Sequence, residues 1–114
     1  MANGNLQIVS VAGNREGHKI LRLKGSLNLQ SVFEFQNVVR AETAPVVILD
    51  FSGVSYIDSA GLGAVVGAYV ATQRTQRKMA VVAMNAQVKT LVEMTHVAHL
   101  IKSYETVGDA EEAL

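Results

Sequence analysis

The sequence predicts an α/β domain with a mixed, mostly parallel sheet of four or five strands and helices packed on it. Segments rich in β-branched residues alternate with segments of helical periodicity in the order ββαβαβα, followed by a short β and a short α segment. The run 46–49 is uninterrupted and apolar, which is typical of a strand buried on both faces. A length of 114 residues suits one core, so we expect residues 1–114 to form a single domain.

The strand predictions rest on β-branched or apolar runs that are bounded by turn residues. These runs are 6–11, 18–24, 46–49, 79–84 and, as a last edge strand, 99–104. The turn 13–17 contains two glycines and joins the first two runs, which predicts a hairpin.

The first helix is predicted from residue 29 to about residue 42. Asn28 is a suitable N-cap, and the backbone restriction before Pro45 ends the helix. Its apolar face is expected to comprise Leu29, Val32, Phe35 and Val39. Near the end of the chain, residues 110–114 are expected to form a short terminal helix.

A second helix is predicted from Ser59 to about Arg77. Its expected apolar face comprises Leu62, Val65, Val66, Tyr69 and Val70. Three glycines at positions 61, 63 and 67 each cost roughly 1 kcal/mol relative to alanine, a cost that close packing on the sheet would offset. Asn85 is expected to cap a third helix.

Three strand ends are expected to meet at one edge of the sheet, where binding sites of α/β domains lie. They are Ser26-Leu27-Asn28, the loop from Asp50 to Ser59, and Met84-Asn85. Ser59 stands at the predicted helix start, where it can act as an N-cap with an exposed hydroxyl. A phosphate at that position would meet free amide groups and the positive end of the helix dipole. Ser59 is therefore a candidate switch of a binding surface.

The composition narrows the possible partners. There is no cysteine, and ten basic residues balance ten acidic ones, so bulk charge favours neither nucleic acid nor a membrane surface. Residues 1–5 lack the features of a signal peptide, and the run 60–71 is shorter than the ~20 residues of a membrane span. We expect a cytoplasmic protein that binds neither nucleic acid nor membranes.

The sequence lacks the motifs of a serine hydrolase and of a nucleotide-binding enzyme. Ile57 stands where a nucleophile elbow has its first glycine, and the glycines of the second helix lie inside the helix rather than in a nucleotide-binding turn. His18, His96 and His99 are expected to be partly exposed and structurally ordinary. His96 and His99 have the spacing of a metal-binding pair, but no third ligand stands out nearby. We expect no enzyme activity, no metal and no cofactor.

The segments Asp50-Phe51-Ser52 and Ile57-Asp58-Ser59-Ala60-Gly61-Leu62-Gly63 closely resemble the central motif of STAS domains, in particular of anti-sigma factor antagonists. The order of elements resembles that family over essentially the full chain. The resemblance implies that an anti-sigma factor, which is also a serine kinase, phosphorylates Ser59, and that Asp58 supports the phosphorylation site. It also implies that the unphosphorylated protein binds this anti-sigma factor and frees the sigma factor. Phosphorylation then ends the binding, and a phosphatase restores it.

On this resemblance we expect a partner-binding surface around Ser59, on a monomer or weak homodimer. Its expected contributors are Ser26, Asn28, Ser55, Asp58, Ala60, Leu62 and Asn85. Phe33 is expected to be a peripheral core residue rather than a contact.

The chain departs from the antagonist pattern at Gly25-Ser26-Leu27-Asn28, where that family usually has Gly-Glu-Leu-Asp. The two missing acids leave a second STAS role open. In that role the domain is a scaffold or regulatory subunit of a stress complex or of a membrane transport system.

Overall fold

The computed structural model describes residues 6–114, and residues 1–5, where no signal peptide is predicted, lie outside this range. The strands are β1 (Leu6–Ala12), β2 (His18–Leu27), β3 (Val46–Ile57), β4 (Lys78–Val82) and β5 (Ser103–Tyr104). The helices are α1 (Val32–Ala41), α2 (Ser59–Arg74), α3 (Ala86–Met94) and α4 (Val107–Ala113), with a 3-10 turn at Ala98–Leu100. Within residues 6–114, no helix has the length and apolar character needed to cross a membrane.

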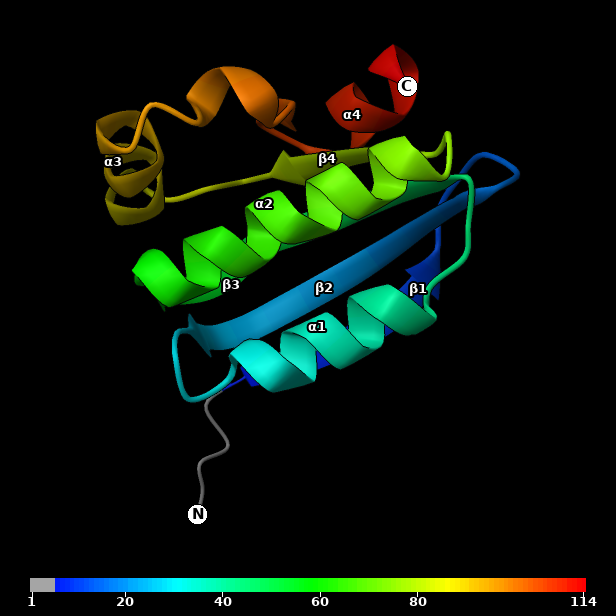
Figure 1. The fold of residues 1–114 in the computed structure, drawn as a ribbon. Coiled ribbons are helices and arrows are strands. Elements are labelled where there is room, and N and C mark those ends of the chain that lie inside the picture. The colour runs from blue at the N-terminus through cyan, green and yellow to red at the C-terminus, as the bar shows by residue number, and fades with distance from the viewer. Residues whose placement is uncertain (1–5) are drawn as a thin grey trace.

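The five strands form one sheet in the order β1-β2-β3-β4-β5. β1 pairs with β2 in antiparallel orientation, and every other neighbouring pair is parallel. Helices α1 and α2 lie side by side on one face, and α4 lies on the other (Figure 1). The predicted fold class, a mixed and mostly parallel sheet with helices packed on it, is confirmed.

The inner strands contribute to two apolar clusters, because successive side chains of a strand point to opposite faces. In β3, Val47 and Leu49 pack with residues of α1, α2 and α3. Val46 and Ile48 instead pack with Ala110 of α4. The run 46–49 is thus buried on both faces, as its uninterrupted apolar sequence predicts.

The prediction of a loop between residues 50 and 59 is wrong, because β3 continues to Ile57. Its parallel pairing with β2 extends to the pair Leu27 and Ile57, with register shifts that interrupt the side-chain alternation. β4 accompanies β3 only as far as Asp50, so the later part of β3 tolerates polar side chains. This part of β3 lies close to β2 at Gly53, where a Cβ would come within 2.7 Å of the Leu23 carbonyl oxygen. The close approach therefore requires a glycine.

Helix α1 begins at Val32, later than predicted, because the preceding residues form a separate turn. Asn28 is not the helix cap. Its Oδ1 accepts hydrogen bonds from the amides of Gln30 and Ser31, at 3.0 and 3.2 Å, as in an Asx-turn. Leu29 therefore lies outside the helix and is exposed, whereas the other three residues of the predicted apolar face are buried.

The predicted apolar face of α2 is partly correct. Leu62 and Val65 are buried, but Val70 is 41% exposed, because the small residues Ala64 and Ala68 face the core instead. Of the three glycines in α2, only Gly61 packs closely against the end of β2.

The last segments also differ from expectation. The predicted edge strand 99–104 is reduced to Ser103–Tyr104, because the residues before it form the 3-10 turn. The terminal helix starts at Val107, ahead of residue 110, because the Thr106 hydroxyl caps it by accepting from the amide of Asp109 at 3.0 Å.

A buried carboxylate joins this terminal helix to the β1–β2 turn. The Glu111 side chain is 4% exposed, and its Oε1 lies 3.0 Å from Nδ1 of His18, whose side chain is 7% exposed. The backbone amides of Asn14 and Arg15 also donate to the carboxylate, at 2.9 and 3.2 Å. The expectation of a structurally ordinary His18 is therefore wrong, because its Nδ1 pairs with a buried carboxylate 93 residues away in the sequence.

The environment of Glu111 sets its charge. Burial alone would raise the pKa of the Glu111 carboxyl, but the hydrogen bonds from Asn14, Arg15 and His18 outweigh burial and lower it. Because the pKa is lower in the folded state, the stabilisation is present above the ordinary pKa of glutamate. It is lost as the pH falls through the lowered value.

We predict that Glu111→Gln lowers the free energy of unfolding at neutral pH by about 2 kcal/mol, because buried donors lose a charged acceptor. The variant should also lose less stability than the parent on acidification. Urea unfolding across an acidic pH series measures both effects. Glu112→Gln, at the exposed neighbouring position, is the control and should behave like the parent. Parallel pH profiles for the parent and Glu111→Gln would contradict the prediction.

A second prediction concerns the glycines of α2. A Cβ at Gly61 would overlap the carbonyl oxygen of Leu27, whereas a Cβ at Gly63 has no atom within 4 Å. We expect Gly61→Ala to lower the free energy of unfolding by about 1–3 kcal/mol through overpacking. Gly63→Ala, the matched control, should raise it by roughly 1 kcal/mol through helix propensity. Equal effects of the two substitutions in urea unfolding would rule out the close contact.

Candidate functional site

The candidate site lies at the edge of the sheet where β2 and β3 end and α1 and α2 begin. Asp58 connects these elements. Its Oδ1 accepts from the Gly61 amide at 2.9 Å, and its Oδ2 accepts from the Leu29 amide at 3.1 Å. One carboxylate therefore caps α2 and holds the turn that leads into α1.

Ser59 is the first residue of α2 and not its N-cap. The prediction that Ser59 caps the helix is wrong, because Asp58 occupies the cap position with extended backbone geometry. Ser59 is exposed, and its hydroxyl forms no hydrogen bond within the described part of the chain. Because Asp58 is the cap, the Ser59 oxygen is free for solvent, whereas a capping serine would have its oxygen engaged by a backbone amide.

Two side-chain amides support the end of β3 where β4 no longer accompanies it. Asn85 caps α3 as predicted, accepting from the Val88 amide at 2.9 Å, and its Nδ2 donates to the Val54 carbonyl at 3.1 Å. The amide of Gln87 pairs with both backbone groups of Ile57, at 3.0 and 2.9 Å. Sequence reasoning missed Gln87, since a polar residue in the first turn of a helix carries no signal of such a contact.

The structure brings most of the predicted contact residues together. The hydroxyl oxygens of Ser26 and Ser55 lie 3.4 Å apart across β2 and β3, and Nδ2 of Asn85 lies 3.5 Å from the Ser55 carbonyl oxygen. Ala60 follows Ser59 and is half-buried. Leu62 is the exception: it is 5% exposed and packs in the core, because it points from α2 towards the sheet.

Large apolar side chains are also exposed in the segments of this edge. Phe33 in the first turn of α1 is 73% exposed, Leu29 is 69% exposed, and Tyr56 near the end of β3 is 47% exposed. The interpretation of Phe33 as a peripheral core residue is wrong, because Val32 and Phe35 occupy the buried face of α1 and Phe33 points away from it. Aromatic side chains exposed in this way are common anchors of protein interfaces.

The charge pattern at Ser59 suits an added anion. The first turn of α2 contains no acidic residue, so Asp58 alone offsets the positive end of the helix dipole. None of the three histidines forms a hydrogen bond with Ser59: His18 begins β2 at its far end and pairs with Glu111, and His96 and His99 are exposed. No histidine is therefore hydrogen-bonded to Ser59 as a general base would be.

Comparison with solved structures places this arrangement among known folds. An anti-sigma factor antagonist from Mycobacterium paratuberculosis is 18% identical, with a TM-score of 0.77 over 99% of this chain and 97% of that one. The Bacillus cell fate determinant SpoIIAA in its phosphorylated form is 15% identical, with a TM-score of 0.68 over 95% and 97%. The murine anion transporter Solute Carrier 26 family member A9 is 17% identical, with a TM-score of 0.77 over 96% of this chain and 22% of the transporter.

These three likenesses show a shared fold. The family itself is shown by the sequence, since the model of the STAS domain matches residues 11–110. This match covers all of the sheet except the first five residues of β1, and it includes the whole edge around Ser59. The chain belongs to the STAS domain family.

Proposed function

We propose that the protein is an anti-sigma factor antagonist whose binding surface surrounds Ser59 and is switched off by phosphorylation of that residue. The observation that carries the proposal is the free, exposed Ser59 hydroxyl at the start of α2. Membership of the STAS family and the likeness to antagonists of similar length support it. In this role the protein is the substrate of a serine kinase and acts in the cytoplasm without catalysing a reaction itself.

The geometry around Ser59 suits a modification that leaves the fold intact. A phosphate adds roughly −1.5 to −2 charge at pH 7 and finds helix amides and a favourable dipole at a helix N-terminus. The Asp58 carboxylate is already committed to the amides of Gly61 and Leu29. The added charge therefore acts mainly on whatever docks against this edge, through repulsion and the cost of burying an anion.

The proposed interface combines polar groups around the serine with apolar anchors beside it. Ser26, Asn28, Ser55, Asp58, Ala60 and Asn85 supply the backbone and side-chain polar groups. Phe33, in the first turn of α1, and Leu29, in the turn before it, supply exposed apolar area. An anti-sigma factor kinase is the proposed partner, and a phosphatase that removes the phosphate restores binding.

A second candidate role is favoured by the likeness to a STAS segment of an anion transporter. The chain carries Ser26 and Asn28 where antagonists usually carry acids, so the surface lacks two charges of that pattern. In this role the domain is a regulatory subunit of a transport or stress complex, and its binding does not depend on phosphorylation.

Phosphorylation of Ser59 can be tested with purified proteins. Incubation with a cognate kinase-type anti-sigma factor and ATP should add the mass of one phosphate, located at Ser59 by peptide mass spectrometry. Ser59→Ala should abolish the mass increase. Ser52→Ala, which removes an exposed hydroxyl outside the proposed interface, is the control and should be phosphorylated like the parent. Undiminished phosphorylation of Ser59→Ala would disprove the assignment.

The effect of a negative charge at Ser59 on partner binding can be tested separately. Ser59→Asp should weaken binding to the anti-sigma factor at least tenfold, or about 1.4 kcal/mol, because a charge enters the interface. The anti-sigma factor is used without nucleotide, so that it cannot phosphorylate the protein during the titration. Ser10→Asp places the same charge at an exposed position of β1 and should leave affinity unchanged. Calorimetric titration measures both. Equal affinities of Ser59→Asp and the parent would favour the transport or scaffold role.

A further inference from the structure

A groove between α1 and α2 lies apart from the Ser59 edge and has no part in the proposed switch. It has a volume of about 390 Å³, within the usual range of small-molecule sites. Its floor consists of apolar residues that are buried or nearly so: Phe35 and Val39 from α1, and Ala64 and Ala68 from α2. The groove stays open because α2 presents small residues, and a Cβ at Gly67 would have no atom within 4 Å.

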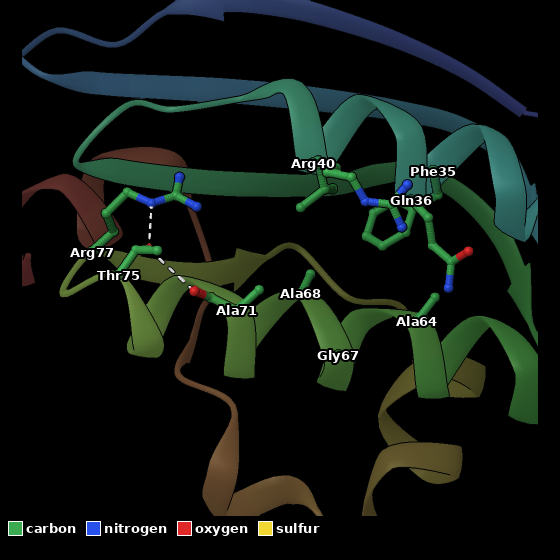
Figure 2. Close-up of a pocket in the computed structure, with 10 residues that line it drawn as sticks. Phe35, Gln36, Arg40, Ala64, Gly67, Ala68, Ala71, Thr75 and Arg77 are labelled. Carbon is green, nitrogen blue, oxygen red and sulfur yellow. Dashed lines mark hydrogen bonds between the residues drawn. The ribbon is translucent and has the colours of Figure 1, made fainter.

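The polar rim of the groove is cationic. Figure 2 shows Gln36 and Arg40 projecting from α1 between the two helices, with Arg77 at the other end. The residues that line the groove include no acid. Glu42, close to Arg77, directs its carboxylate to the Ala44 amide at 3.0 Å. In a chain with no net charge, two arginines at one groove are a local positive site.

The two guanidinium groups differ in how they are held. Arg77 is fixed, because its Nη1 donates to the carbonyls of Glu42 and Ala44 at 3.0 and 3.3 Å and its Nε donates to Thr75 at 2.8 Å. Its Nη2 has no hydrogen bond to another residue of the range 6–114. Arg40 is exposed and forms no ion pair within that range. Both therefore have donors available for an anion.

We propose that this groove binds a small amphipathic anion, namely a single alkyl chain that ends in a carboxylate or a phosphate. The buried alanines and Phe35 accept the chain, and Arg40 binds the anionic head by charge-assisted hydrogen bonds, while Arg77 adds positive charge at the other end of the groove. From Ala64 to Ala71 the wall of α2 is about 10 Å long, which suits a medium-length chain. A docking helix is too wide for this volume, because its diameter with side chains is about 10–12 Å.

Calorimetric titration of the full chain with decanoate, below the concentration at which it forms micelles, tests the proposal. Decanoate and decyl phosphate should each bind saturably at one site, and uncharged decanol should bind at least tenfold more weakly. Arg40→Gln should weaken decanoate binding at least tenfold. Vesicles of anionic phospholipid form a third arm, which separates a free amphiphile from a lipid surface.

Two leucine substitutions locate the site. Gly67→Leu should fill the groove and abolish decanoate binding, while the melting temperature does not fall, because the new side chain enters open space on a helix. Gly63→Leu, one turn earlier and also open, lies outside the groove and should bind decanoate like the parent. Equal binding of decanol and decanoate, undiminished binding by Gly67→Leu, or binding to vesicles without binding to decanoate would each overturn the proposal.

Discussion

The carboxylate of Asp58 is the interaction on which the arrangement of the candidate site depends. It caps α2 through the Gly61 amide and holds the turn before α1 through the Leu29 amide. The backbone reinforces this link, because the Asp58 amide donates to the Leu27 carbonyl at 3.3 Å. Gly61 allows α2 to cross that same carbonyl without a clash. Two helices and the end of β2 are therefore positioned by one short stretch of chain.

A surface held in this way suits a switch that changes charge rather than shape. Asn85 and Gln87 hold the end of β3, so the backbone before Asp58 remains anchored after β4 has ended. Ser59 follows this anchored segment, and its side chain is free. A phosphate at such a position has little to rearrange within the domain, and its effect falls on the partner.

The two faces and the two ends of the sheet carry different tasks. At the far end, Glu111 connects α4 to the β1–β2 turn through hydrogen bonds. Helix α4 covers the face of the sheet opposite α1 and α2. The groove between α1 and α2 lies between these ends, and Arg40 and Arg77 line its rim. Separation of this kind allows stability, partner binding and ligand binding to be altered by different substitutions.

The sequence by itself determined the core, the fold class and the motif around Ser59. Apolar runs such as 46–49, the helical spacing of Val32, Phe35 and Val39, and the Asn85 cap depend on neighbours within a few residues, and the structure agrees with each of them. The predicted site residues Ser26, Ser55 and Asn85 also meet as expected, because the ends of adjacent parallel strands share one edge.

Only the tertiary structure decided the features that depend on distant partners. β3 extends to Ile57 because β2 and Gln87 supply its hydrogen bonds. The Asp58 carboxylate caps α2 and also accepts a hydrogen bond from the Leu29 amide, which lies 29 residues away in the sequence. The direction in which α2 faces the sheet decided that Ala64 and Ala68 are buried and that Val70 is exposed. The pairing of His18 with Glu111 joins residues 93 positions apart. Local propensity has no information about such contacts, because their free energy arises only when the chain has folded.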